Sequence, residues 1–396
     1  MNRRILALLL ALVMVAGLMT GCASGKQEAA APETAQTESP TAEDTAAEPE
    51  QTEESPAEEE APAEPETVSF TDSLGRTVEL PADITRIAPS GAVATMILAA
   101  IAPECMVTIN AAPSESQIAF LPANLAALPE TGQMYGSKAN LNLETLLAAD
   151  PQVVIDLGDK KGDMTEDLDA LQEQIGIPVI FIEADLPHMA AAFRTLGGLL
   201  SGKADRGEEL AALVDRTTTM AEENAAKITD DTRVRVMYTT GEDGLGTNAA
   251  GSMQAQVLDM VGVENAVVVE DVSNKGGGNI ISLEQLYNFD PDVILFADGS
   301  IYDTVADDSA WSQLTAISTG KYYEVPGSPY SWLSGPPSMN MILGVWWLGN
   351  LIYPEIYDYD METMTQELYK TLWGYELSSE EVTALLGNST LKAAAQ

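Results

Sequence analysis

The stretch NLETLLAADPQVVI at residues 142–155 recurs without a gap, 140 residues later, as SLEQLYNFDPDVIL at residues 282–295. In each copy Asn142 or Ser282 stands where it can cap a short helix, and Asp-Pro ends that helix before an apolar strand. A solenoid requires more than two copies. The repeat therefore predicts two lobes built on the same plan.

Short apolar runs alternate with helical patterns on both sides of the repeat. Two opening strands flank a turn at residues 72–75. The other candidate strands are residues 86–88, 106–109, 153–157, 179–182, 233–238, 293–296 and 322–325. This alternation is typical of α/β proteins with mostly parallel sheets. We predict an α/β fold in which each lobe has a central, mostly parallel sheet.

Residues 203–228 separate the two halves of the repeat. They contain no proline, a single glycine at Gly207, and much Ala, Glu and Leu, which favours a helix. About 25 residues at 1.5 Å each give a length of ~37 Å. We predict one long helix joining a first lobe at residues 68–202 to a second at residues 229–396. The alternative is a peripheral helix within one domain.

The first 21 residues have the pattern of a secretory signal. Arg3 and Arg4 precede an apolar run over residues 5–19, which is short for a membrane-spanning helix. The run ends in LMTGC at residues 18–22, which resembles a bacterial lipobox and predicts lipidation of Cys22. Ordinary secretion with an incidental cysteine, and an uncleaved anchor, are the alternatives. We expect the protein outside the cytoplasm, anchored by lipid at the cell surface or in a periplasm.

Composition separates a tether from the body. Residues 27–67 hold 14 acidic and no basic residues with little to bury, so we expect residues 22–67 to form a disordered tether. The chain from Val68 onward has 16 basic and 47 acidic residues, within a total net charge of −42. That balance excludes nucleic-acid binding through a basic surface.

Four further motifs accompany the repeat in a characteristic order. They are TDSLGR at 71–76, RIAPS at 86–90, YSWLSGPPS at 330–338 and LGVWWL at 343–348. With these motifs the chain resembles the substrate-binding proteins of ABC importers for iron-siderophores, haem and cobalamin. The resemblance covers about residues 68–386 and implies two lobes joined by one helix. It also implies a monomer without a cofactor that delivers a metal chelate or macrocycle to an ABC permease and its ATPase.

The resemblance assigns a docking role to one glutamate in each lobe. The matching positions are Glu144 and Glu284, which the internal repeat also singles out. Two carboxylates on separate lobes would form a two-point electrostatic contact with arginines of the membrane subunits. The alternative is that each glutamate only complements the N-terminus of its helix, which contributes about 0.3–1 kcal/mol.

Loops that follow strands are the candidates for the ligand site, because open α/β sheets bind ligands at the carboxyl ends of their strands. Tyr330 and Trp332 are attractive because aromatic rings in a proline-bounded loop provide rigid walls, although they alternatively pack against their own lobe. The full candidate set is Ser90, Gly91, Tyr135, Lys160, Thr240, Asn248, Tyr330 and Trp332.

The inventory of metal ligands argues against a bare transition metal. His188 is the single histidine and Cys105 the single thiol of the body, whereas such sites use several His or Cys ligands. We therefore expect a chelated metal, or alternatively a molybdate- or tungstate-like oxyanion. Many family members have arginine after Pro-Pro-Ser-x-Asn, where this chain has Met341, which makes a highly anionic chelate less secure.

Two other functions compete with import. Enzymatic catalysis by a Ser/His/Asp or Cys/His set would require a nucleophile beside His188, which has no nucleophile motif around it. We predict that the protein is not an enzyme. A ligand-sensing lipoprotein of the same fold is the second alternative.

Overall fold

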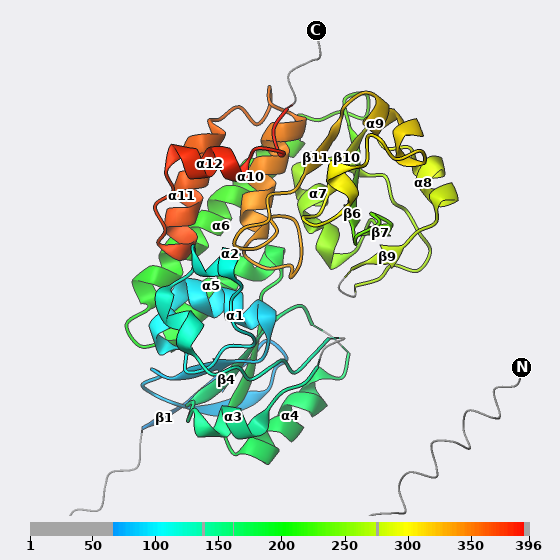
Figure 1. Cartoon of the computed structure of the whole chain (residues 1–396). Coiled ribbons are helices and arrows are strands. Elements are labelled where there is room, and N and C mark those ends of the chain that lie inside the picture. The colour runs from blue at the N-terminus through cyan, green and yellow to red at the C-terminus, as the bar shows by residue number, and fades with distance from the viewer. Residues whose placement is uncertain (1–65, 137–138, 161, 275–276, 392–396) are drawn as a thin grey trace, which may run out of the picture. The chain divides into compact units, whose positions relative to one another are not determined.

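The computed structural model describes residues 66–136, 139–160, 162–274 and 277–391, which contain helices, a two-stranded sheet and two larger, mostly parallel sheets (Figure 1). The predicted signal and Cys22, and nearly all of the predicted tether, lie outside these residues. The chain opens with the antiparallel pair β1 (Thr67–Thr71) and β2 (Thr77–Pro81). No helix in the described part of the chain is long and apolar enough to cross a bilayer.

The first sheet consists of three parallel strands in the order β3-β4-β5. Their bounds are β3 (Ile87–Pro89), β4 (Val153–Gly158) and β5 (Val179–Glu183). The helices of this part are α1 (Ala92–Ile101), α2 (Glu115–Ile118), α3 (Leu143–Ala148), α4 (Met164–Ile175) and α5 (Met189–Leu199). Helices α1, α4 and α5 pack against the sheet. Strands buried on both faces read as continuous apolar runs, which is why the sequence located β4 and β5 correctly.

The prediction of a strand over residues 106–109 is wrong. Met106 and Ile109 each form only an isolated bridge, to Ile87 and Glu130 respectively. The segment follows a 3-10 helix at Pro103–Cys105. The chain therefore enters from a tight turn, and single residues touch the sheet edge without continuing along it.

The second sheet has six strands, with β10 and β6 at its centre. Its path is β11-β10-β6-β7-β9, and β8 pairs with the other end of β6; β6, β8, β10 and β11 are parallel. The strands are β6 (Arg235–Thr240), β7 (Gly246–Thr247), β8 (Glu264–Asn265), β9 (Asn279–Ile280), β10 (Val293–Phe296) and β11 (Tyr322–Glu324). The helices are α7 (Gln256–Val261), α8 (Leu283–Phe289), α9 (Thr315–Ser318), α10 (Met341–Ile352), α11 (Met361–Trp373) and α12 (Ser379–Leu385).

The internal repeat extends to the backbone. Asn142 and Ser282 cap α3 and α8 by accepting hydrogen bonds from the amides of Thr145 and Gln285. Asp150 and Asp290, which follow the two helices, have φ of 51° and 30° and are the only non-glycine residues with positive φ in the described chain.

An equivalent arginine supports each of these turns. Arg86 donates from Nε to the carbonyl of Asp150 at 2.8 Å, and Arg235 donates from Nη1 to the carbonyl of Asp290 at 3.2 Å. The two lobes thus repeat side-chain contacts as well as sequence.

Helix α6 (Ala204–Ala225) corresponds to the predicted connector and is four residues shorter. Near its start, Arg206 donates to the carbonyl of Ala100 in α1 and to that of Thr371 in α11. Near its middle, the hydroxyl of Thr217 accepts from Nε1 of Trp346 in α10 at 2.8 Å. These bonds fix α6 to elements from both halves of the chain, as a connector requires.

A second junction was not predicted from the sequence. The ring of Phe120, from the first half of the chain, stacks edge-on against Tyr369 and Tyr375 at centroid distances of 5.6 and 5.0 Å. Buried residues from both halves form one apolar cluster around α6 and α10. Trp346 and Trp347 belong to this cluster, as expected for an all-apolar helix.

Candidate ligand-binding site

The candidate site lies at the carboxyl ends of the parallel strands, where open α/β sheets bind ligands. In the first lobe these ends belong to β3, β4 and β5, and in the second to β6, β8, β10 and β11. The amide of Leu186, just after β5, donates to Oε1 of Gln256 at the start of α7, 3.4 Å away. The loops that follow strands in the two lobes are therefore neighbours at this point.

Ser90 and Tyr135, both predicted ligand residues, are brought together by Asp156. Ser90 Oγ donates to Asp156 Oδ1, and the carbonyl of Ser90 accepts from the amide of Met134 at 2.8 Å. Burial and the negative charge of Asp156 raise the pKa of Tyr135, so its phenol remains protonated and neutral. Asp156 is only 5% exposed within β4. Asp156 was not predicted from the sequence, although a carboxylate within an otherwise apolar strand could have indicated a functional position.

Gly91 and Lys160 lie at the ends of β3 and β4. Gly91 precedes α1, and the first turn of this helix has no side-chain cap and no acidic residue. The backbone amides of that turn can therefore donate to a ligand or to water. Lys160 forms an ion pair of 2.8 Å with Glu183, at the end of β5. The charge of Lys160 is thus balanced within the lobe, and it is a weaker anion site than its sequence position indicated.

In the described part of the second lobe, eight side chains have a buried polar atom without a hydrogen bond, and three neutral ones among them lie close together in the sequence after β7. They are Asn248 at both side-chain atoms, Ser252 at Oγ and Gln254 at Oε1, with exposures of 2%, 2% and 4%. Burying such groups without a partner costs about 1–3 kcal/mol each. This set therefore favours a ligand or water that supplies the missing bonds.

One residue of this set, Gln254, lies close in the sequence to the contact between the lobes. Asn248 follows β7, and its carbonyl accepts from Nδ2 of Asn265 in β8 at 2.9 Å. Gln254 is two residues from Gln256, the partner of Leu186. Asn248 was predicted from its loop, whereas Ser252 and Gln254 were missed because nothing in their local sequence indicates burial.

The two aromatic residues of the predicted ligand loop differ in burial. Trp332 is fully buried, with its ring 6.3 Å from that of Tyr369 and Nε1 donating to the carbonyl of Ser328 at 3.4 Å. Its prediction as a ligand wall is corrected: the ring packs within the protein. Tyr330 remains partly exposed, and burial raises its pKa to about 12, so its phenol is neutral at physiological pH. Thr240 donates from Oγ1 to the carbonyl of Gly277 at 3.2 Å.

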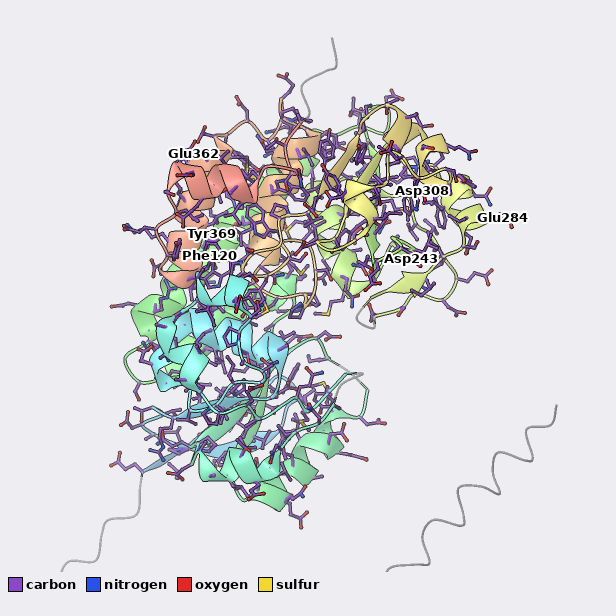
Figure 2. The ribbon with its side chains drawn as sticks, in the orientation of Figure 1. Phe120, Asp243, Glu284, Asp308, Glu362 and Tyr369 are labelled. Carbon is purple, nitrogen blue, oxygen red and sulfur yellow. The ribbon has the colours of Figure 1, made fainter. Side chains whose placement is uncertain are left out.

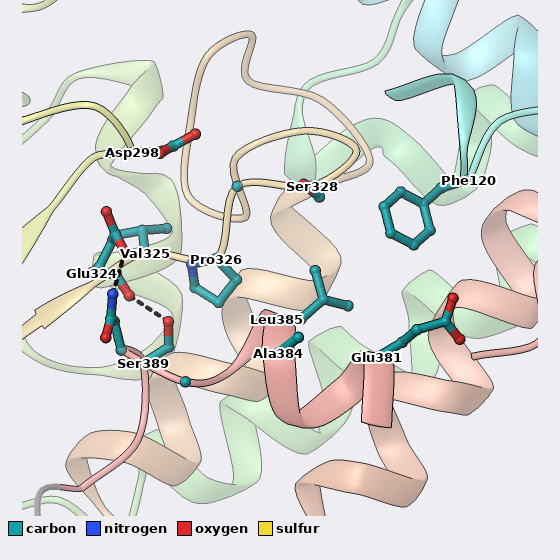
Figure 3. A pocket seen from close by; sticks show the side chains of 13 residues that line it. Phe120, Asp298, Glu324, Val325, Pro326, Ser328, Glu381, Ala384, Leu385 and Ser389 are labelled. Carbon is teal, nitrogen blue, oxygen red and sulfur yellow. Dashed lines mark hydrogen bonds between the residues drawn. The ribbon is translucent and has the colours of Figure 1, made fainter. Parts of the chain in front are cut away.

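A separate groove of about 460 Å³ lies beside α12 and the chain after β11, and Phe120 forms part of its wall (Figure 3). None of the predicted ligand residues lines it. Its carboxylates include Glu381, which accepts from Ser378 and Tyr375, and Glu324, which accepts from Asn388. These groups hold the C-terminal segment in place.

No group of three or more His, Cys, Asp or Glu side chains is arranged to hold a metal ion within the described residues. His188 contacts Asp185 through Nδ1, and Cys105 is buried with 6% exposure. The strand ends present hydroxyl and amide groups together with the buried carboxylate of Asp156 and the Lys160–Glu183 ion pair.

Residues 106–329, more than half of the chain, match the family model described as periplasmic binding protein. The chain belongs to this family. The periplasmic binding protein is therefore an extracytoplasmic substrate-binding component of an ABC transporter that delivers a small molecule to the permease. Members are binding proteins and not enzymes, which confirms that prediction. No curated protein sequence gives a match.

Solved structures of binding proteins share the fold. An ABC transporter solute-binding protein from Sulfurospirillum deleyianum is 29% identical with a TM-score of 0.74, covering 81% of this chain and 99% of its own. A periplasmic solute-binding protein from Veillonella parvula is 24% identical, with a TM-score of 0.68 and coverages of 82% and 98%. The molybdate-bound periplasmic protein of a Haemophilus influenzae ABC transporter is 20% identical, with a TM-score of 0.64 and coverages of 78% and 99%.

Glu144 and Glu284 occupy equivalent positions on this periplasmic binding protein. Each lies in the first turn of a repeated helix, α3 or α8, and is exposed. Neither forms an ion pair with another described residue. Glu284 lies at the outer surface of the second lobe (Figure 2). Both carboxylates are thus available to an external cation.

Proposed function

We propose that this binding protein is a lipoprotein, anchored through Cys22, that captures a metal held in a small chelate. An iron-siderophore is the primary candidate for the cargo, with haem and cobalamin as related macrocycles. The observation that carries the ligand class is the set of buried neutral groups at Asn248, Ser252 and Gln254. Such groups suit the polar periphery of an organic chelate, whereas a bare transition metal binds several His, Cys or carboxylate ligands.

An oxyanion such as molybdate or tungstate is the second candidate. The uncapped first turn of α1 after Gly91 supports it, because free helix amides and their dipole favour anions. Lys160 adds little to this because Glu183 neutralises it. The two candidates differ in whether an organic molecule accompanies the metal.

Mass spectrometry of the native protein from its own host distinguishes these candidates. We expect a co-purifying organic mass that disappears on denaturation, together with iron or cobalt in elemental analysis. Molybdenum or tungsten without an organic mass would favour the oxyanion. A stoichiometric bare transition ion would contradict both.

Replacing Asn248 by Leu is expected to weaken binding of the co-purified ligand by about tenfold or more. The isosteric apolar side chain removes a donor and an acceptor and leaves ligand polar atoms unpaired, which costs about 1–3 kcal/mol. Titration calorimetry measures the change. Thr319→Val is the matched control, since its hydroxyl bonds only to carbonyls of α9. Equal affinities of wild type and Asn248→Leu would remove Asn248 from the site.

A further inference from the structure

Exposed apolar side chains are frequent in the part of the sequence that includes Glu284. Of the nine large apolar residues that are exposed in the described chain, five lie between residues 268 and 287: Val268, Val272, Ile280, Leu283 and Tyr287. Asn279, next to Ile280, holds the neighbouring segment by donating from Nδ2 to the carbonyl of Asp271 and accepting from the amide of Ser273. Leu283 and Tyr287 lie four residues apart on α8 and so share one helix face, and adjacent exposed apolar groups on a soluble protein are typical of an interaction site.

The repeat places one apolar residue at the same position in both lobes. Leu147 and Tyr287 each lie three residues after the glutamate of their helix, and their side chains are 46% and 39% exposed. Residues three apart on a helix are neighbours on one face. In each lobe, then, an exposed carboxylate and an exposed apolar group are adjacent.

Tyr287 is held in a fixed orientation. Its hydroxyl donates to the carbonyl of Ala310 at 2.9 Å, while more than a third of the side chain remains in solvent. A rigid aromatic ring loses little entropy on binding, and such residues dominate the energy of protein interfaces. Leu147 offers apolar contact without a π face.

We propose that each pair, Glu144 with Leu147 and Glu284 with Tyr287, receives one arginine side chain of the permease. The carboxylate bonds the guanidinium, and the residue three positions later packs against its plane or its stem. Arginine fits better than lysine because its planar group forms paired bonds with a carboxylate and stacks on aromatic rings. Unpaired carboxylates on a strongly acidic body make a cationic partner the complementary one.

The two pairs are unequal, and this makes docking directional. The second lobe adds an aromatic ring and the exposed Leu283 on the same helix, whereas the first lobe adds Leu147 alone. The second lobe therefore contributes more of the binding energy and sets which way round the binding protein sits on the membrane subunits. This inference rests on the proposed docking role of the glutamates.

Binding of purified variants to the permease in lipid nanodiscs tests the inference. We expect Tyr287→Ala to weaken binding about tenfold and Leu147→Ala about two- to threefold, with ligand affinity unchanged in both. Tyr287→Phe keeps the ring and is expected to stay within about twofold of wild type. Ile118→Ala is the matched control, because Ile118 is exposed to 46% on α2, outside the repeated helices.

A double-mutant cycle separates this inference from the docking proposal itself. In Glu284→Gln the effect of Tyr287→Ala should shrink, because both groups contact one arginine. Loss of binding in Glu284→Gln with no loss in Tyr287→Ala overturns the inference and leaves glutamate docking standing. If neither variant weakens binding, the docking proposal itself fails.

Discussion

Arginine at both Glu144 and Glu284 is expected to reduce ligand uptake to background while ligand affinity stays unchanged. Each exposed carboxylate is proposed to meet a permease cation, so charge reversal replaces attraction by repulsion at two points. Like-charge contacts at an interface cost several kcal/mol, which exceeds a hundredfold in affinity at about 1.4 kcal/mol per tenfold. Uptake by cells lacking the wild-type gene, paired with calorimetry of ligand binding, measures both quantities.

Glu362→Arg is the matched control for this double variant. Glu362 is exposed in the first turn of α11, whose N-cap is Asp360 (Figure 2), so it has the same relation to a helix N-terminus but lies outside the repeat. If Glu144 and Glu284 served only their helices, all three reversals would cost about 0.3–1 kcal/mol of stability each and none would affect uptake. Unimpaired uptake in the double variant would contradict the docking proposal and would favour a sensing role.

The repeat could be predicted because its determinants are local. Caps at Asn142 and Ser282, the Asp-Pro helix ends and the apolar strands all act within a few residues. The same locality explains why β4, β10 and α6 were found close to their observed bounds. The sequence could not show that Arg86, just before β3, and Arg235, at the start of β6, support these turns, because each arginine is more than 50 residues away from its turn.

The ligand site was predictable only in outline. Ser90 and Asn248 could be proposed as ligand residues because strand ends are recognisable in the sequence, but whether a side chain faces solvent or core depends on distant partners. Trp332 is buried by Tyr369 of α11, and Gln254 by a loop that includes Asn274. Neither partner is near in sequence, so one residue was wrongly included and the other missed.

Helices α5 and α6 pack closely against each other because Gly197 of α5 and Gly207 of α6 are in contact. A Cβ atom on Gly207 would lie 2.6 Å from the carbonyl oxygen of Phe193 and 2.8 Å from Cα of Gly197. These are backbone atoms that cannot move independently of the helix. The absence of both side chains allows the two helices to touch along their backbones.

Gly207→Ala is therefore expected to destabilise the protein by about 1–3 kcal/mol, the usual cost of overpacking. The methyl group must push α5 away from α6, and this outweighs the gain of about 0.5–1 kcal/mol from replacing glycine within a helix. Gly198→Ala, on α5 itself, is the matched control because its new Cβ would meet no atom within 4 Å. Gly198→Ala should gain the free energy of replacing glycine by alanine within a helix, and it should therefore be more stable than wild type. Urea unfolding of both variants measures the difference.

Gly207→Ala is also expected to change ligand affinity, because α5 is connected to the contact between the lobes. The 3-10 helix Leu186–His188 leads directly into α5, and it carries the amide of Leu186 that bonds Gln256 of the second lobe. Displacing α5 should strain that contact, so Gly207→Ala is expected to bind ligand more weakly, whereas Gly198→Ala should match wild type. Stability changes of the same sign in both variants would contradict the close contact. A stability loss without a loss of affinity would show that the junction at Leu186 tolerates movement of α5.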